Sequence, residues 1–322
     1  MAGKEKTYRV EAVIDLPAPL YLGSDFLGLL RPAVIGGVGV HVVLPDFSIS
    51  GSETVLHPRA LVNWVDSFAG RESADDSRWP FGEVFGWGKE REFSATRLLV
   101  LPRGRLTLRQ ARELHRAAED WVELLGIWLD VVARTDLHEE RIKVDKPGQS
   151  AYVWVDRDKA PKLFKGKHTI TLNLDGLSHE ITPWQWGKML AKASEAARPP
   201  EGHLFLRDAR HALNMGFHRR AVLDSATATE LALAKLRDDA LSPDKVGLGD
   251  YVRGKAQQIG GLTEFLSGMG RQLPERIQQE VGEPRNKAIH EGREPDGETA
   301  ARALAKTEEV LDLAFPWNGL LA

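Results

Sequence analysis

The sequence contains no cysteine among its 322 residues. Disulfide bonds, thiolate zinc sites and cysteine nucleophiles are therefore excluded. Residues 1–9 are charged and lack the apolar core of a secretory signal peptide. The longest apolar stretch, residues 27–44, is interrupted by glycines and by Arg31, Pro32 and His41, so it is not expected to span a membrane. We expect a cytoplasmic protein with no membrane partner.

The sequence also lacks an excess of basic charge. Its formal net charge is -3, and residues 201–322 hold 16 Lys and Arg against 19 Asp and Glu. No positive field extends over the whole chain, so a site for a polyanion must be a local patch. The hydrophobic fraction of 42% and the charged fraction of 28% are ordinary for a globular protein. The length is sufficient for two domains.

Residues 1–198 are expected to form a β-rich α+β domain with an undefined role in sensing or substrate recognition. Polar and apolar residues alternate in residues 8–14, and β-branched residues fill residues 38–44, as in strands. The period then changes to three and four residues, which predicts a helix over residues 108–133 that Thr107 caps. Further expectations are strands at 97–101, 151–155 and 168–174, a helix at 184–197, and loops at 70–89 and 138–150.

Residues 199–322 are expected to form a second domain, which contains helices only. Pro199 and Pro200 end the preceding helix and mark the boundary. Gly216 stands where a helix would end in a left-handed residue. Four or five amphipathic helices with short links predict a helical bundle, so the fold class is α+β with an all-α C-terminal part. The expected helices cover residues 204–215, 219–239, 250–266, 274–281 and 298–314, and a further helical turn begins at Pro284 and ends near Gly292.

The stretch that carries chemistry is Arg285-Asn286-Lys287-Ala288-Ile289-His290. In a helix, Asn286 and His290 lie on one face, and the long Arg285 side chain can reach that face. RNA cleavage without a metal needs proton transfer at the 2′- and 5′-oxygens and a fixed cation for the growing phosphorane charge. The imidazole of His290 suits the first task. The guanidinium of Arg285 suits the second, and Asn286 can orient His290 or donate to the phosphate.

This segment resembles the HEPN superfamily, whose motif is Arg-x4–6-His, often with Asn, Asp or His in second place. The motif residues here are Arg285, Asn286 and His290, and the resemblance covers roughly residues 200–315. It also includes a long preceding helix with an acidic residue near its middle, here Glu230. A β-rich region followed by a C-terminal HEPN domain looks most like the ApeA-like defence proteins.

The resemblance implies a four- to five-helix bundle that dimerises and cleaves RNA without a metal or other cofactor. Such domains occur in toxins, in RNA-processing enzymes and in anti-phage abortive-infection proteins. A homodimer would also answer a chemical need, because one histidine poorly covers both acid and base roles and a two-fold axis supplies a second. Glu230 is then a further candidate catalytic residue. Lys287, Arg219 and Arg220 are candidate contacts to RNA phosphates.

Other interpretations remain open. The Arg285–His290 segment is also compatible with an ordinary surface helix end, where a cationic His290 favours the helix dipole. An inactive HEPN module that binds RNA or protein, or a purely structural dimerisation domain, would have the same pattern. Pro284 puts the geometry of Arg285 in question if it kinks the backbone.

Two further patterns favour structure over chemistry. The glycines at 36, 37 and 39 lack the spacing of a phosphate-binding loop and indicate a turn before a strand. His203, His211 and His218 lack a carboxylate that would complete a metal site, so no metal is expected.

Overall fold

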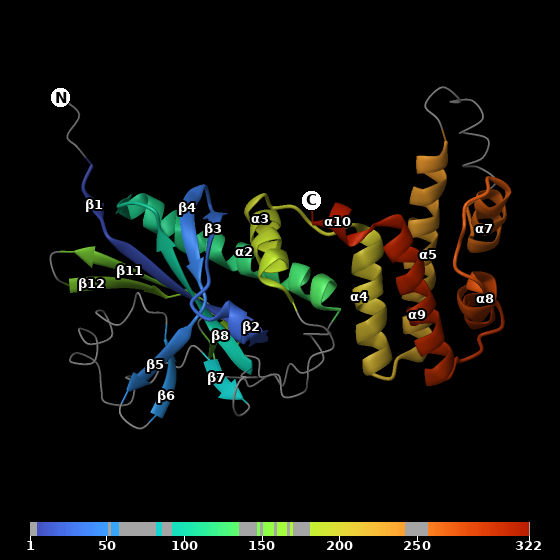
Figure 1. The fold of residues 1–322 in the computed structure, drawn as a ribbon, viewed down its shortest axis with the longest axis horizontal. Coiled ribbons are helices and arrows are strands. Elements are labelled where there is room, and N and C mark those ends of the chain that lie inside the picture. Colours follow the sequence, from blue (N-terminus) through green and yellow to red (C-terminus); the bar gives the residue numbers. More distant parts are fainter. Residues whose placement is uncertain are drawn as a thin grey trace. The chain divides into compact units, whose positions relative to one another are not determined.

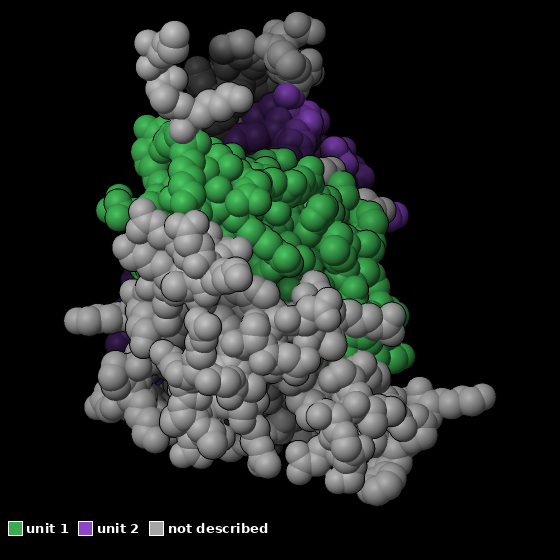
Figure 2. Space-filling model, turned by 90° about the vertical axis from the view of Figure 1, so that its left-hand side faces the viewer, with its two compact units in different colours: residues 1–198 green, residues 199–322 purple. Residues whose placement is uncertain are grey.

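The chain divides into two compact units, Met1–Arg198 and Pro199–Ala322 (Figure 2). The division falls where Pro199 and Pro200 place it in the sequence. The fold class is α+β, with a strand-rich N-terminal unit followed by helices, as predicted. A computed structural model describes residues 5–50, 53–57, 82–85, 92–134, 147–148, 151–157, 160–165, 168–169, 181–241 and 257–321.

The N-terminal unit is built on a seven-stranded sheet in which all neighbouring strands are antiparallel. The strand order is β12-β11-β2-β8-β4-β3, and β7 also pairs with β8 (Figure 1). The register of β2 against β8 shifts between Asp15 and Leu20, the stretch that contains Pro17 and Pro19, which have no amide hydrogen. The strands are β2 (Val10–Gly23), β3 (Leu30–Ile35), β4 (Val38–Val43), β7 (Gly82–Phe85), β8 (Glu92–Pro102), β11 (Ala151–Arg157) and β12 (Ala160–Lys165).

Three small pairings complete the described strands of this unit. Each joins two short antiparallel segments. The pairs are β1 (Thr7–Tyr8) with β9 (Leu106–Thr107), β5 (Asp46–Ser50) with β6 (Glu53–His57), and β10 (Pro147–Gly148) with β13 (His168–Thr169). A single 3-10 turn, η1 (Ser24–Phe26), follows β2.

Helix α2 (Leu108–Ala133) packs on this sheet against β2 and β11. Its bounds match the prediction, and Thr107 caps it through a reciprocal pair of hydrogen bonds with Gln110. The apolar stripe of the helix buries Trp121 and Trp128. Helix α3 (Pro183–Ser194) packs against α2 and β3. The core of this unit therefore joins one sheet to two helices through large side chains.

Several expectations in this unit need correction or lie outside the described residues. The loop predicted at 70–89 contains strand β7, and the loop predicted at 138–150 contains β10. The strand predicted at 168–174 is described only at His168–Thr169. The glycine turn is confirmed, because Gly36 and Gly37 have φ angles of 57° and 76° and join β3 to β4. A side chain at Gly36 would meet the Ala117 Cβ at 2.7 Å, so glycine is required there.

The C-terminal unit is a helical bundle, and its described residues contain no strand. Gly216, with φ of 74°, ends the first helix as predicted. Asp296 caps α9 by accepting a hydrogen bond from the Thr299 amide. The helices are α4 (Glu201–Asn214), α5 (His218–Ala240), α7 (Ile259–Gly268), the π-helix η4 (Gln278–Gly282), α8 (Glu283–His290), α9 (Gly297–Ala314) and α10 (Trp317–Leu320).

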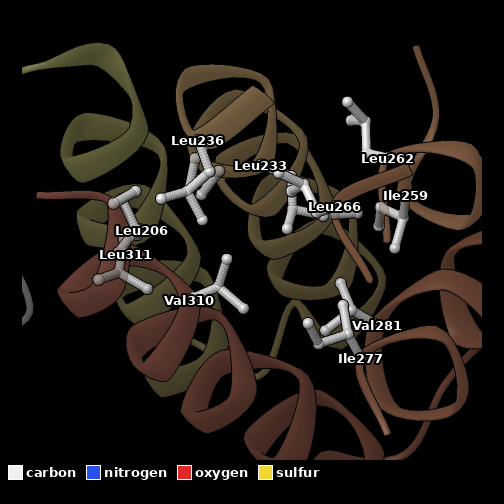
Figure 3. Packing of buried hydrophobic residues seen from close by; sticks show 14 residues of the cluster. Leu206, Leu233, Leu236, Ile259, Leu262, Leu266, Ile277, Val281, Val310 and Leu311 are labelled. Carbon is white, nitrogen blue, oxygen red and sulfur yellow. The ribbon is translucent and has the colours of Figure 1, made fainter. Parts of the chain in front are cut away.

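Helix α5 is the centre of this bundle, because it contacts α4, α7, α8, α9 and η4. Its Leu233 and Leu236 belong to the buried apolar cluster that several of these helices share (Figure 3). The other labelled members of this cluster are Leu206, Ile259, Leu262, Leu266, Ile277, Val281, Val310 and Leu311. A second, smaller cluster consists of Ala212, Ala221, Val222, Ala300 and Ala303. No helix in the described part of the chain is both long and apolar enough to cross a membrane.

Candidate functional site

Helix α8 carries the motif and continues directly from a π-helix. In η4, the Glu283 amide bonds to the Gln278 carbonyl, five residues back instead of four. Pro284 follows at once as one of the first residues of α8. Proline has no amide hydrogen, and its ring collides with the carbonyl four residues back in an α-helix. The wider π turn relieves that collision, so Pro284 does not end the helix and Arg285 remains on a regular α-helical turn.

The Arg285 guanidinium has two partners. Its Nη2 lies 3.8 Å from Oε1 of Glu230 on α5. Its Nη1 donates to the Asn286 side-chain oxygen at 3.1 Å. The Arg285 side chain is 24% exposed, so solvent reaches it from one side. A guanidinium has five N–H donors, and this arrangement leaves donors for a phosphate while two contacts restrict its orientation.

Glu230 joins this pair to a third helix. Its carboxylate accepts a hydrogen bond from the backbone amide of Ile259, the first residue of α7. Partial burial raises the pKa of Glu230 above its ordinary value, while the charge of Arg285 and the Ile259 amide act in the opposite direction. Side-chain exposure is 26%. Glu230 is thus a half-buried carboxylate with one cation and one backbone donor as partners.

Asn286, Lys287 and His290 are exposed on α8. Asn286 and His290 are four residues apart, about 6 Å along the axis and on one face. Gly292, with φ of 64°, ends the helix after His290, and the Arg293 amide bonds back to the Lys287 carbonyl. The imidazole therefore projects to solvent from the last turn, where a helix end favours positive charge.

Arg219 and Arg220 lie elsewhere on the bundle. Both are exposed in the first turn of α5, and Arg220 pairs with Asp224 at 3.3 Å. They are ten or more residues from Glu230, roughly 15 Å along the helix axis. The structure brings together Glu230, Arg285 and Asn286 and places His290 one turn away. It does not bring the two α5 arginines into that group.

The backbone amide of Ile259 is the contact that sequence reasoning missed. A backbone donor has no residue-type signal, and Ile259 lies 29 positions after Glu230, on a different helix. Gln278 was missed as well. If Gly282 carried a Cβ, that atom would lie 2.5 Å from the Gln278 side-chain oxygen, and a Cβ on Gly260 would lie 3.4 Å from the same oxygen. The Gln278 side chain therefore packs against the backbone of both glycines, just before α8.

The histidines considered for a metal do not form a cluster with acidic residues within the described ranges. His203 is buried and its ring lies 5.5 Å from that of Phe315. His218 lies beside Gly297 at the start of α9. His203 therefore packs between helices, and His218 lies at a helix end.

Comparisons with known proteins do not extend these observations. No protein-family model matches the chain, and neither a curated protein nor a solved structure shows significant similarity to it.

Proposed function

We propose that the protein is a metal-independent endoribonuclease of the HEPN type. The observation that carries the proposal is the arrangement on α8. A guanidinium that contacts Glu230 and Asn286 and a solvent-exposed imidazole lie on the same short helix. A fixed cation and a group that can take up and release a proton are the two components that phosphodiester cleavage without a metal requires.

The chemistry assigns one role to each side chain. A base removes the proton of the RNA 2′-hydroxyl, and the 2′-oxygen attacks phosphorus. The bond from phosphorus to the 5′-oxygen then breaks, and an acid protonates the leaving oxygen. The products are a 2′,3′-cyclic phosphate and a free 5′-hydroxyl. His290 transfers protons, Arg285 stabilises the charge on the phosphorane, and Asn286 orients Arg285 through its side-chain oxygen.

A homodimer through the helical unit is part of the proposal. Two copies of α8 facing each other across a two-fold axis would supply one His290 as base and the other as acid. Lys287, Arg219 and Arg220, all exposed, are the proposed contacts to flanking phosphates. Cytoplasmic RNA as substrate, and a role as a toxin or in anti-phage defence, follow from the HEPN resemblance.

The test is cleavage of total RNA by the purified full-length protein in excess EDTA. We expect fragments that end in 2′,3′-cyclic phosphate, which polynucleotide kinase with its phosphatase activity converts to a 3′-hydroxyl. His290→Ala should abolish cleavage and leave the unfolding midpoint unchanged, because the side chain is exposed. Arg271→Ala, which removes an exposed cation on the connection after α7, serves as the control. Undiminished cleavage by His290→Ala would eliminate the proposal.

A second candidate function is an inactive module that binds RNA or a partner protein. The observation in its favour is the ion pair of Arg285 with Glu230, since a phosphate must compete with a carboxylate already beside the guanidinium. This alternative predicts no cleavage by the unmodified protein. It also predicts saturable, salt-dependent RNA binding that survives His290→Ala.

A further inference from the structure

Helix α3 of the N-terminal unit carries two tryptophans with opposite surroundings. Trp186 is fully buried and anchors the helix in the core of that unit. Trp184, two residues earlier, is 51% exposed. It lies in the first turn of α3, which Thr182 caps through a reciprocal pair of hydrogen bonds with Gln185. Trp184 is therefore an indole on a well-defined helical turn that is half open to solvent.

Two cations lie on the helix face that carries this indole. The Lys188 Nζ lies over the Trp184 ring, 5.7 Å from its centroid. Gly187 belongs to the same face, since it follows Trp184 by three residues. The Arg31 side chain of β3 packs against Gly187, because a Cβ on this glycine would lie 3.7 Å from both Cδ and Nε of Arg31. An ammonium and a guanidinium therefore accompany the exposed ring.

A second contact fixes α3 along β3, the last strand in the order of the seven-stranded sheet. The Val34 amide on this edge strand donates to the Ser194 hydroxyl at 2.8 Å. A strand rises about 10 Å from Arg31 to Val34, and a helix rises about 10 Å from Gly187 to Ser194. These equal rises allow α3 to run alongside the edge strand with both contacts made. The helix face and the Arg31 side chain are therefore arranged before any ligand binds.

Charge complementarity indicates the kind of ligand. Helix α3 and strand β3 contain no acidic residue, although the whole chain has a formal net charge of -3. Their basic residues are Arg31, Lys188 and Lys192. The residues that share the helix face of Trp184 include no large apolar side chain that would extend the indole into a patch for a protein partner. A single exposed aromatic ring among cations is suited to a nucleobase and its phosphates.

We infer that Trp184, Lys188 and Arg31 form a binding site for single-stranded RNA on the N-terminal unit. The indole stacks on one unpaired base, and the ammonium and the guanidinium contact the flanking phosphates. Duplex RNA does not fit, because its bases already stack on one another. The site therefore selects unpaired strand and is tolerant of base identity. That the bound strand is also a substrate rests on the proposed ribonuclease function, whereas the binding does not.

The first test measures the affinity of the full-length protein for a short fluorescent oligouridine by anisotropy, in excess EDTA. All proteins compared carry His290→Ala, so that the proposed cleavage does not interfere. Trp184→Ala should weaken binding about tenfold or more, because it removes a stacking contact, and Trp184→Phe should restore much of the loss. Lys188→Ala and Arg31→Ala should each weaken binding several-fold and reduce the slope of log affinity against log salt concentration by about 0.7.

Lys6→Ala is the matched control. The Lys6 Nζ lies 5.6 Å from the centroid of the Tyr8 ring, in a similar cation–aromatic pair whose ring is buried and cannot stack on a base. Its affinity for oligouridine should be unchanged. An abasic oligonucleotide of the same length should bind more weakly and should not respond to Trp184→Ala. Equal affinities of the Trp184→Ala and parent proteins for oligouridine would refute the inference, and so would an equal loss with the abasic strand.

Cleavage kinetics separate a failure of this site from a failure of the proposed function. If the protein cleaves RNA, Trp184→Ala with His290 intact should raise KM for a single-stranded substrate several-fold and leave kcat nearly unchanged. An unchanged KM would refute the inference and leave the ribonuclease function standing. A protein that binds oligouridine through Trp184 but cleaves no RNA would refute the proposed function and support the binding site.

Discussion

The two units bury different kinds of side chain. In the strand-rich unit the largest fully buried groups are aromatic, among them Trp128, Trp186 and Phe26. In the helical unit many fully buried positions are alanines, such as Ala228 and Ala232 on α5. Large side chains fill the space between a sheet and its helices, whereas small ones allow helix backbones to approach closely. The N-terminal core should therefore be sensitive to lost volume, and the C-terminal core to added volume.

The difference extends to polar groups. In the helical unit, close approach of α5 and α9 places Thr229 and Thr307 in contact, with their hydroxyl oxygens 3.0 Å apart and fully buried. Longer polar side chains such as Glu230 and Arg285 then lie at the rims of the helix contacts, where they are half-buried. Restricted but accessible charged groups are what a catalytic or binding site requires. Four changes to the chain, ordered here by decreasing expected effect, would break or sharpen this contrast.

Truncation in the aromatic core should have the largest effect. Trp128→Ala removes a buried ring, together with the 2.7 Å hydrogen bond from its Nε1 to the Ala197 carbonyl. We expect a loss of about 3–5 kcal/mol in the free energy of unfolding. Chemical denaturation followed by tryptophan fluorescence measures it, because eight of the nine tryptophans lie in residues 1–198. Trp184→Ala, at a residue 51% exposed, is the control and should change stability little.

If the protein is the proposed ribonuclease, Arg285→Lys should reduce RNA cleavage about a hundredfold while the fold is retained. Lysine keeps the charge, but it cannot reach Glu230 and Asn286 together and still present a planar fork to phosphate. Single-turnover cleavage of a labelled RNA measures the loss. Arg271→Lys makes the same chemical change at an exposed position and should be neutral. Equal rates for the two variants would remove Arg285 from the mechanism.

Overfilling should be the weakness of the helical core. Ala228→Leu adds volume at a fully buried position of α5 and should cost about 1–3 kcal/mol in the free energy of unfolding. Hydrogen exchange across α4 and α5 reports it in the full-length protein. Ala301→Leu, on the exposed face of α9, is the matched control. If both variants were equally stable, the alanine interface would be looser than its burial indicates.

The smallest effect is a pair of opposite pH dependences within the helical unit. Burial raises the pKa of Glu230 above its ordinary 4.5, so the stability from this group is present below that value and is lost as pH rises through the raised pKa. Hydrogen bonds from Thr299 lower the pKa of Asp296 below its ordinary 3.8. The stability from Asp296 is therefore present above that value and is lost as pH falls through the lowered pKa.

Thermal unfolding of two amide variants across the acidic range separates these contributions. Relative to the unmodified protein, Glu230→Gln should become more favourable as pH rises from about 4 toward neutrality. Asp296→Asn should become less favourable as pH rises over the range below about 4. Parallel curves for the two variants would show that the carboxylates do not titrate as their surroundings imply.

The helices were more predictable from the sequence than the strands, and the reason is the range of their contacts. The bounds of α2 follow from a local period and from the Thr107 cap, which are properties of neighbouring residues. Strand β7 pairs with β8, but its segment has no periodic signal, so the sequence alone indicates a loop there. Strand β12 was likewise not predicted, since its partner β11 gives it stability that the segment alone does not reveal.

For the candidate site too, the sequence predicts the contacts between neighbouring residues but not those between distant ones. The spacing of Arg285, Asn286 and His290 places them on one short helix, and that helix is present. Glu230 came from the HEPN resemblance, and the ion pair with Arg285 joins residues 55 positions apart, which no spacing rule defines. The HEPN relationship, the catalytic roles and the dimer remain predictions.

The π-helix before α8 determines in which direction around the helix axis the side chains of α8 face. Each residue of an α-helix advances the next by about 100°, and a π turn accommodates one extra residue without breaking the helix. Removing one residue from Gln278–Gly282 would return the segment to α geometry and turn the motif by about 100° about its own axis. Arg285 would then leave Glu230, and His290 would leave its present solvent face, with no motif residue altered. The length of this turn is thus as specific a determinant as the identity of the side chains after it.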